Sequence, residues 1–398
     1  MGRFSRVAYL AGRGRLWLSQ AGFPVAWPPV GSEDMARRRR RAGRTGVLAR
    51  WPVSLRPLAW LAMFPGWAFG AWRSSTDLVR AHPSLATHPG RRKIWSAALK
   101  HNFQPREVVE YGLLETGSNA PDLWFCEHEM FGIWEKLTPQ ATRMFAADKR
   151  AFAEFCADEN LPHAKTLAIW ENGIARSLPT EWPAAIALKP AAANNAQGFE
   201  AWVERDGRYH REKLSLSPAE FADHGAALSR HWGVMLAQPL LELHADLAAR
   251  GLTGMPVARL ITGLWPTGEI TLCDAYFSAP SVGAYASNAS FGPKWPVDIA
   301  SGQIEPSQSR LLPRWQGQPL EGTRLPIWAE AVAAVQRGHE RFAHKAPVLG
   351  WDVAFAAQGP VLLEANTGIS FVVPQGTRRR PVGGDPIARL VDAWLTTE

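Results

Sequence analysis

The sequence predicts an α+β protein in which two lobes, each built from strands and helices, are joined near Gln238. From residue 145 onward, short apolar strand signals alternate with amphipathic helix signals, and no internal repeat or low-complexity linker interrupts them. The stretch "GVMLAQPLLEL" (233–243) reads as a strand that leaves the first group of elements toward the second. We therefore expect lobes at 145–238 and 239–398, behind a helical region at 91–144.

The elements have individual signals in chain order. Strand signals are short apolar runs closed by turn residues, and they fall at 164–170, 183–190, 199–210, 233–243, 257–264, 269–277 and 349–366. The stretch 142–160 has apolar residues at helical spacing and stops before Pro162. The stretch 217–231 opens with a capping box of Ser217 and Glu220, and 326–342 is a third helix. Asp206-Gly207 marks a hairpin turn, whereas 288–325 is rich in loop residues.

The positive charge of the chain is concentrated at its start. The formal net charge is +8, but residues 1–50 contain 11 Arg, no Lys, Glu33 and Asp34, which leaves −1 on the other 348 residues. A body close to neutral lacks the basic surface that nucleic-acid binding requires, so we expect no nucleic-acid partner.

The cysteines indicate a reducing setting. Cys126, Cys156 and Cys273 lie far apart without a CxxC or Cys/His spacing, and "CEHEM" (126–130) fits no zinc-ligand pattern. Neither a disulfide framework nor a structural zinc site is predicted. The expected location is cytoplasmic.

The first 90 residues form two segments. Residues 1–50 read as a basic, disordered tail with a second possible start at Met35, and residues 51–90 as a Trp-rich segment. The run 51–72 contains Arg56 and three prolines, so it does not offer the roughly 20 uninterrupted apolar residues of a membrane-spanning helix. Two alternatives stay open: residues 35–72 lie on the inner face of a membrane, with Arg37 to Arg41 attracted to anionic lipid, or the segment packs on the body.

The hairpin "LGWDVAFAAQGPVLLEANTG" (349–368) is apolar except at Asp352, Glu364 and Asn366. A two-residue loop at 358–359 would turn Asp352 away from Glu364, whereas a three-residue loop at 357–359 places the two acids opposite each other with Asn366 on the same face. Two acids and an amide oxygen suit Mg²⁺, which takes its other ligands from water and phosphate. The alternative is that these are ordinary acids at strand ends.

Two lysines lie at positions suited to contact with phosphate groups. Lys149 begins a helix in "ADKRAF", and Lys189 ends a buried strand immediately before the small polar loop "PAAANNAQGF" (190–199). A lysine at such a place offers a point charge with three donors. Each lysine taken alone is also compatible with a solvated surface position.

The order of these motifs resembles that of the ATP-grasp superfamily. The resemblance runs from about Lys149 to Phe371, through "DK", "ALKP", "LAQPLLEL", "VARLITG" and "GWDVAFAAQGPVLLEAN", and is nearest to the sugar-transfer-associated branch related to α-L-glutamate ligases. It implies two α+β lobes that clamp ATP behind an N-terminal helical and basic extension. The implied roles are phosphate binding by Lys149 and Lys189, adenine binding by the backbone from Gln238 to Leu240, ribose binding by Glu242, catalysis by Arg259, substrate binding by Asn288, and one or two Mg²⁺ at Asp352, Glu364 and Asn366.

The resemblance implies carboxylate activation through an acyl phosphate, followed by attack of an amine. The expected function is an ATP- and Mg²⁺-dependent carboxylate–amine ligase that acts on a small-molecule carboxylate and an amine or sugar-linked acceptor in cell-surface polysaccharide or sugar-precursor modification. The alternatives are an ATP-grasp phosphotransferase and a non-catalytic nucleotide-binding accessory protein.

The sequence departs from the family pattern in one loop. The loop 190–199 keeps a single glycine, Gly198, where the family is glycine-rich. Arg378 to Arg380 are either an anion site or a solvated basic loop.

Overall fold

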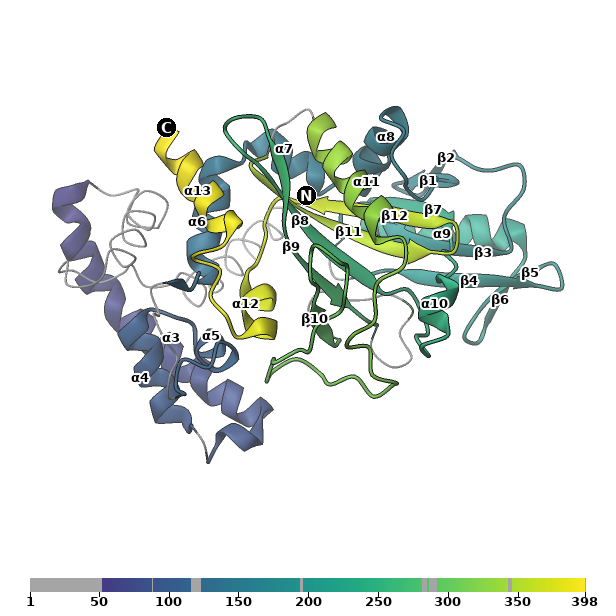
Figure 1. Cartoon of the computed structure of the whole chain (residues 1–398). Coiled ribbons are helices and arrows are strands. Elements are labelled where there is room, and N and C mark those ends of the chain that lie inside the picture. The colour runs from purple at the N-terminus through teal and green to yellow at the C-terminus, as the bar shows by residue number, and fades with distance from the viewer. Residues whose placement is uncertain are drawn as a thin grey trace.

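The computed structural model describes residues 52–87, 89–115, 123–193, 196–280, 285, 292–342 and 346–397. The chain is an α+β protein with a helical N-terminal region and two antiparallel sheets (Figure 1). The predicted basic tail, residues 1–50, lies outside the described residues. Within the described part of the chain, no helix has the length and apolar character needed to cross a membrane.

The N-terminal region consists of short and long helices. They are η2 (Val53–Leu55), α3 (Arg56–Ala81), η3 (Pro83–Leu85), α4 (Arg91–His101), α5 (Pro105–Glu110), α6 (Glu127–Leu137) and α7 (Gln140–Ala146). The second half of α3 packs on α4, where Trp72 meets Trp95 edge to face and Arg91 lies over the Trp72 ring. This part of the predicted Trp-rich segment is therefore packed against the protein.

The first sheet has seven strands in the order β2-β1-β7-β3-β4-β5-β6. The strands are β1 (Ala168–Glu171), β2 (Ile174–Ser177), β3 (Ala185–Pro190), β4 (Glu200–Arg205), β5 (Arg208–Arg211), β6 (Leu214–Leu216) and β7 (Val234–Pro239). Helix α9 (Pro218–Trp232) covers one face, and the predicted capping box of Ser217 and Glu220 is confirmed. Gly225 permits this packing, because a Cβ there would lie 2.6 Å from the ring of Trp170. The predicted turn at Asp206-Gly207 is also confirmed, with both residues at positive φ.

The second sheet has five strands in the order β10-β9-β8-β11-β12. The strands are β8 (Val257–Leu264), β9 (Ile270–Ser278), β10 (Lys294–Pro296), β11 (Val348–Ala356) and β12 (Gly359–Asn366). One face packs against α11 (Trp328–Arg341). On the other face, α6 and α13 (Pro386–Thr397) cover one end around Ile261, and the rest faces the first sheet. The short helices α10 (Ala245–Ala248) and α12 (Val372–Arg378) lie outside the sheets.

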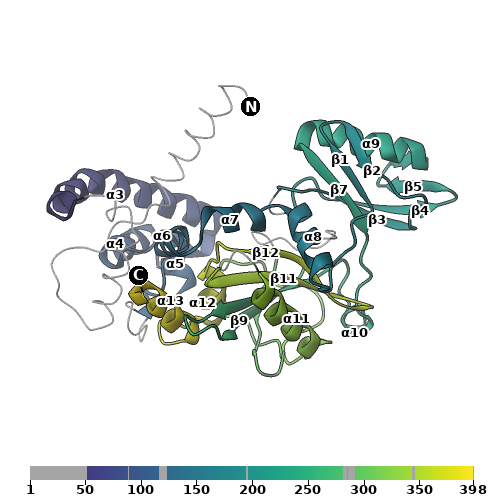
Figure 2. The ribbon, with the colours of Figure 1, turned by 90° about the horizontal axis from the view of Figure 1, so that it is seen from above.

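The predicted helix over 142–160 is two helices. Helix α7 ends at Ala146, and Asp148 begins α8 (Lys149–Asp158), because its side chain accepts hydrogen bonds from the backbone N–H groups of Arg150 and Ala151. Although α8 lies within 145–238 in sequence, Phe152 packs on Trp351 in the core of the five-stranded sheet. Figure 2 shows α8 between the two sheets. Lys149, at its first turn, is thus placed at the boundary between the lobes.

The hairpin of β11 and β12 has the predicted pairing of its two acids, but for a different reason. Asp352 does lie opposite Glu364, but Ala356 pairs with Gly359, so the loop contains the two residues 357 and 358 rather than three. The register then shifts by one between Asp352 and Val353, where β12 has one extra residue. This β-bulge, and not the loop length, brings the two acids opposite each other.

Candidate functional site

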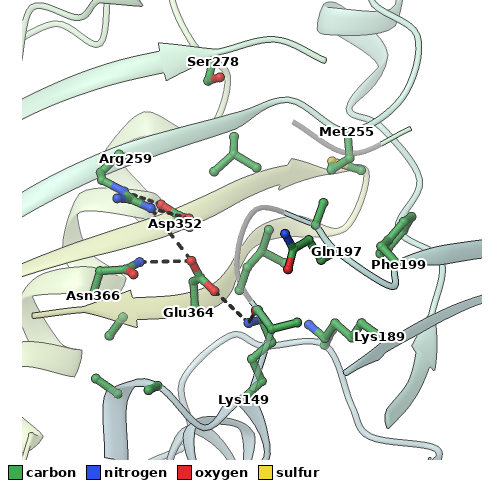
Figure 3. Close-up of a pocket in the computed structure, with 18 of the residues that line it drawn as sticks. Lys149, Lys189, Gln197, Phe199, Met255, Arg259, Ser278, Asp352, Glu364 and Asn366 are labelled. Atoms are coloured by element: carbon green, nitrogen blue, oxygen red, sulfur yellow. Dashed lines mark hydrogen bonds and ion pairs between the residues drawn. The ribbon is translucent and has the colours of Figure 1, made fainter. Parts of the chain in front are cut away.

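A cavity of about 650 Å³ lies between the two sheets. Residues from α8, β3, β7, β8, β9, β11 and β12 line it, together with the loop that follows β3. Figure 3 shows Lys149 and Lys189 on one side, with Arg259, Asp352 and Glu364 facing them from the five-stranded sheet. The structure thus brings together the charged residues that the sequence pointed to separately.

Asp352 is the centre of a row of side chains across the five-stranded sheet. It pairs with Glu364 on one side and with Arg259 on the other. Arg259 donates from Nε to Oδ1 of Asp352 at 2.6 Å and from Nη2 to Oδ2 at 2.7 Å. Gly350, on the strand of Asp352, leaves room for Ile369 and for this arginine, since a Cβ there would lie 2.5 Å from Ile369 Cδ1 and 3.3 Å from Arg259 Cδ. The bidentate ion pair fixes the guanidinium at the cavity wall.

Glu364 connects the sheet to helix α8. Lys149 Nζ lies 3.2 Å from Glu364 Oε2 and donates to the carbonyl oxygen of Ala193 at 2.6 Å. Asn366 Nδ2 donates to Glu364 Oε1 at 3.1 Å. Each carboxylate of the predicted metal site is therefore paired with a basic side chain.

The two opposed acids differ in proton affinity. Burial raises the pKa of Asp352 to about 6, although the charge of Arg259 acts to lower it. Burial also acts to raise the pKa of Glu364, but the positive charges of Lys149 and Arg259 outweigh it and lower that pKa to about 2. Glu364 is therefore ionised at neutral pH.

Lys189 reaches the same space from the end of β3. Burial and the nearby charge of Lys149 lower its pKa to about 8, while Glu364 acts to raise it. An ammonium group whose pKa is lowered by a neighbouring positive charge is stabilised by an anion between the two groups. A polyphosphate provides such charge, with oxygens for several donors.

Asp352, Glu364 and Asn366 are the oxygen donors of the predicted magnesium site. Among the described residues, no cluster of three or more His, Cys, Asp or Glu side chains has the geometry of a metal centre. Two carboxylates and one amide oxygen are instead a partial set, of the kind that Mg²⁺ completes with water and phosphate oxygens. Asp352, Glu364 and Asn366 all line the cavity, so such ligands have access to them.

Of the predicted adenine and ribose residues, Gln238 and Leu240 line the cavity, whereas Glu242 lies at the exposed surface. Gln238 lines the cavity, but its side-chain amide donates to the carbonyl oxygen of Ala164 at 2.9 Å. The N–H of Leu240 donates to Ala185 at 3.0 Å and is used within the fold. Glu242 is exposed and does not occur among the described residues that line the cavity. Asn288 lies outside the described residues.

Arg378 and Arg379 are partly buried and ion-paired, whereas Arg380 is exposed and also ion-paired. Arg378 donates to Asp274 at 2.8 Å and to the carbonyl oxygen of Val297 at 3.0 Å. Arg379 forms a bidentate pair with Glu115, and Arg380 forms one with Asp385. The three arginines therefore tie the C-terminal segment to β9, to the N-terminal region and to itself.

Sequence reasoning did not identify Tyr276, Ser278 and Lys294, which also line the cavity. Tyr276 pairs with Arg259, and Ser278 pairs with both Val257 and Lys294. Alternation along 269–277 places Tyr276 on one face with Ser278, but only strand pairing shows that this face is the one with Arg259. If the pairing of β8 with β9 had been predicted correctly, Tyr276 and Ser278 would both have been identified.

Comparison with known proteins gives similarity in structure only. No family model and no curated protein matches the chain. D-alanine–D-alanine ligase from Bacillus anthracis is similar at 8% identity and a TM-score of 0.38, over 65% of this chain and 71% of that one. Biotin carboxylase from Campylobacter jejuni is similar at 12% and 0.40, over 67% and 51%. A RimK domain ATP-grasp protein from Sphaerobacter thermophilus is similar at 15% and 0.34, over 64% and 69%. With TM-scores below 0.5, these similarities carry no weight beside the geometry of the site.

Proposed function

We propose that the chain is an ATP-grasp enzyme that joins a carboxylate to an amine with ATP and Mg²⁺. The observation that carries this proposal is the convergence of two lysines and two carboxylates on one cavity between two sheets. The lysines suit the phosphates of a nucleotide, and the carboxylates with Asn366 suit the cation that accompanies it. The resemblance of the motifs from Lys149 to Phe371 supports the same assignment.

The residues present are matched to phosphoryl transfer to a carboxylate. Lys149 and Lys189 would hold and neutralise the phosphates, while Mg²⁺, when bound at Asp352, Glu364 and Asn366, would supply further positive charge. A substrate carboxylate oxygen bonds to the γ-phosphorus as the bond to the ADP oxygen breaks. The amine then bonds to the acyl carbon, phosphate leaves, and the amine loses a proton. Arg259, held at the cavity wall, would stabilise the negative oxygen in either step.

Turnover tests this proposal directly. Purified protein is supplied with ATP, Mg²⁺ and a panel of amino acids and sugar acids, with hydroxylamine as a general amine. Release of ADP and phosphate that depends on both the acid and the amine is expected. A stable phosphorylated acid without free phosphate would instead indicate a phosphotransferase, and nucleotide binding without turnover would indicate an accessory protein.

The two lysines should each contribute to nucleotide affinity. Lys149→Ala and Lys189→Ala should each weaken ATP binding by about 1.5 to 3 kcal/mol, or roughly ten- to a hundredfold in Kd, because each removes a charge-assisted phosphate contact. Titration calorimetry measures the effect. Lys165→Ala, which changes an exposed lysine outside the cavity, is the matched control. Wild-type affinity in both cavity variants would contradict the phosphate roles.

The same lysine pair predicts a pH dependence. Since the pKa of Lys189 is lowered to about 8 in the empty site, Lys189 loses its proton as the pH rises above 8. A bound phosphate favours the charged form and raises this pKa, so binding takes up a proton. ATP affinity should therefore fall between pH 8 and pH 9.5, by at most about tenfold per pH unit. In Lys189→Ala this fall should be absent.

We further propose that residues 35–72 contact an anionic membrane surface, on the cytoplasmic side, where the enzyme modifies a sugar-linked precursor of a cell-surface polysaccharide. Leu58, Leu61 and Phe69 on α3 are 65%, 62% and 68% exposed. Their spacing puts them on one side of the helix, and the arginines 37–41 precede that helix in sequence. Apolar exposure combined with nearby positive charge suits a surface of anionic lipid.

Vesicle flotation tests the membrane contact. The protein should float with anionic vesicles and less with neutral ones, and Leu58→Asp with Leu61→Asp should reduce flotation several-fold. These substitutions are preferable to removal of all residues before Thr87, because Trp95 Nε1 donates to the carbonyl oxygen of Ala68 and α4 packs on α3. Met144→Asp, at an exposed apolar residue elsewhere, is the control. Equal flotation of all variants would contradict the proposal.

A further inference from the structure

A second row of side chains crosses the five-stranded sheet beside the row of Arg259. Val257 pairs with Ser278, and Ser278 pairs with Lys294 on the neighbouring strand. Val257 and Ser278 lie two residues from Arg259 and Tyr276 along their strands, so both rows occupy the same face. All of these residues line the cavity. In Figure 3, Ser278 lies across the cavity from the two phosphate-binding lysines, beyond Arg259.

Lys294 is an unusual residue for this position. Its side chain is only 2% exposed, and Nζ donates to the carbonyl oxygen of Gly292 at 3.1 Å. Burial and the positive charges of Arg106 and Arg259 lower its pKa to about 8. A methionine would fill nearly the same volume without the desolvation cost of an ammonium group. Packing alone therefore does not account for a lysine here.

The distance from Lys294 to Arg259 leaves room for a small molecule. Two strands and two residues separate them, which corresponds to about 12 Å between their Cα atoms. Long side chains from both positions reach into one cavity and make its far end positive. An acid bound with its reacting carboxylate at Arg259 would extend toward Lys294.

We propose that Lys294, with the hydroxyl of Ser278, binds an anionic group of the substrate other than the carboxylate that is activated. The inference rests on the proposed function, which places the reacting carboxylate at Arg259. The preferred acid is then at least a dianion, either a dicarboxylate or an acid with a phosphate or phosphonate group. An ammonium group with three donors suits both kinds of anion.

Binding of small acids to the full chain tests the subsite. Dicarboxylates from malonate to adipate, and phosphonoacetate and phosphonopropionate, are titrated against monocarboxylates of the same length, with saturating ADP and Mg²⁺ and again without nucleotide. At least one dianion should bind about tenfold or more tightly than its monoanion, as expected for a charge-assisted contact. Comparison of the dicarboxylates with the phosphonates shows which kind of anion the subsite recognises.

Variants assign the preference to Lys294. Lys294→Met should bring the affinity for the preferred dianion down to that of the monoanion, whereas Lys294→Arg, which keeps the charge, and Lys165→Met should preserve the difference. Ser278→Ala should reduce it, and this variant decides the matter if Lys294→Met does not fold. Absence of a dianion preference in the wild type, or its full retention in Lys294→Met, would overturn the subsite. Failure of ADP to bind would contradict the proposed function, while the titration without nucleotide still decides the subsite.

Discussion

Replacement of Glu364 by glutamine should lower Mg²⁺-dependent ATP turnover by about 100-fold or more, as expected when a catalytic cation loses a carboxylate ligand. Glutamine retains the shape of the side chain and accepts the hydrogen bond from Asn366. It removes the negative charge that faces Lys149 at 3.2 Å. Turnover as a function of Mg²⁺ concentration measures the effect, and excess Mg²⁺ should restore part of the activity.

Glu330→Gln, at an exposed glutamate on α11, is the matched control and should turn over at the wild-type rate. Thermal stability without Mg²⁺ should fall slightly in Glu364→Gln. Relief of repulsion at Asp352 alone would raise it, but Glu364 also pairs with Lys149 and lies near Arg259. Unchanged turnover at limiting Mg²⁺ would refute the metal role of Glu364.

Arg259→Met should impair both catalysis and folding. Loss of a fixed positive group at the reacting oxygen should lower turnover by about 100- to 1,000-fold. The free energy of unfolding should fall by about 3 kcal/mol, because Asp352, without its bidentate partner, must either bury an unpaired charge or take up a proton. This value is at the low end for buried pairs, since the Arg259 and Asp352 side chains remain 15% and 19% exposed. Arg250→Met, at an exposed arginine, is the control.

A double variant separates the two effects of Arg259. In Arg259→Met combined with Asp352→Asn, both charges are gone, so at least half of the lost stability should return while turnover stays low. Denaturant unfolding and steady-state turnover provide the two measurements. If Arg259→Met unfolds at the wild-type denaturant concentration, the ion pair does not support the fold. If Arg259→Met turns over ATP at the wild-type rate, Arg259 has no part in the chemistry.

The local features of the site could be predicted from the sequence. Lys149 at a helix start, Lys189 at a strand end and the three polar residues of the hairpin are all visible as departures from an apolar pattern, and the structure brings them to one cavity. The pairing of Asp352 with Glu364 was also predicted, but from a three-residue loop that does not exist. A bulge leaves no mark in the alternation of apolar residues when neighbours on both faces are buried, so its position could not be deduced.

Long-range contacts limited the rest of the prediction. Arg259 was expected at the cleft, but its bidentate bond to Asp352 depends on the antiparallel pairing of β8 with β11, which are 83 residues apart between Leu264 and Val348. The hydrogen bond that occupies the N–H of Leu240, and the exposure of Glu242, likewise depend on tertiary structure. Tyr276 and Lys294 are unremarkable residues until strand order places Tyr276 beside Arg259 and Lys294 in the neighbouring row on the same face.

The bulge in β12 lies between two parts of the β11–β12 hairpin that have different neighbours. Toward its tip, the N–H of Ala357 donates to Glu242, and the carbonyl oxygen of Phe355 accepts from His244, so this part is attached to the segment that joins the two sheets. Beyond the bulge, Asp352 and Glu364 are attached to β8 and α8. The tip of the hairpin and the two acids therefore have different anchors on the two sides of the bulge.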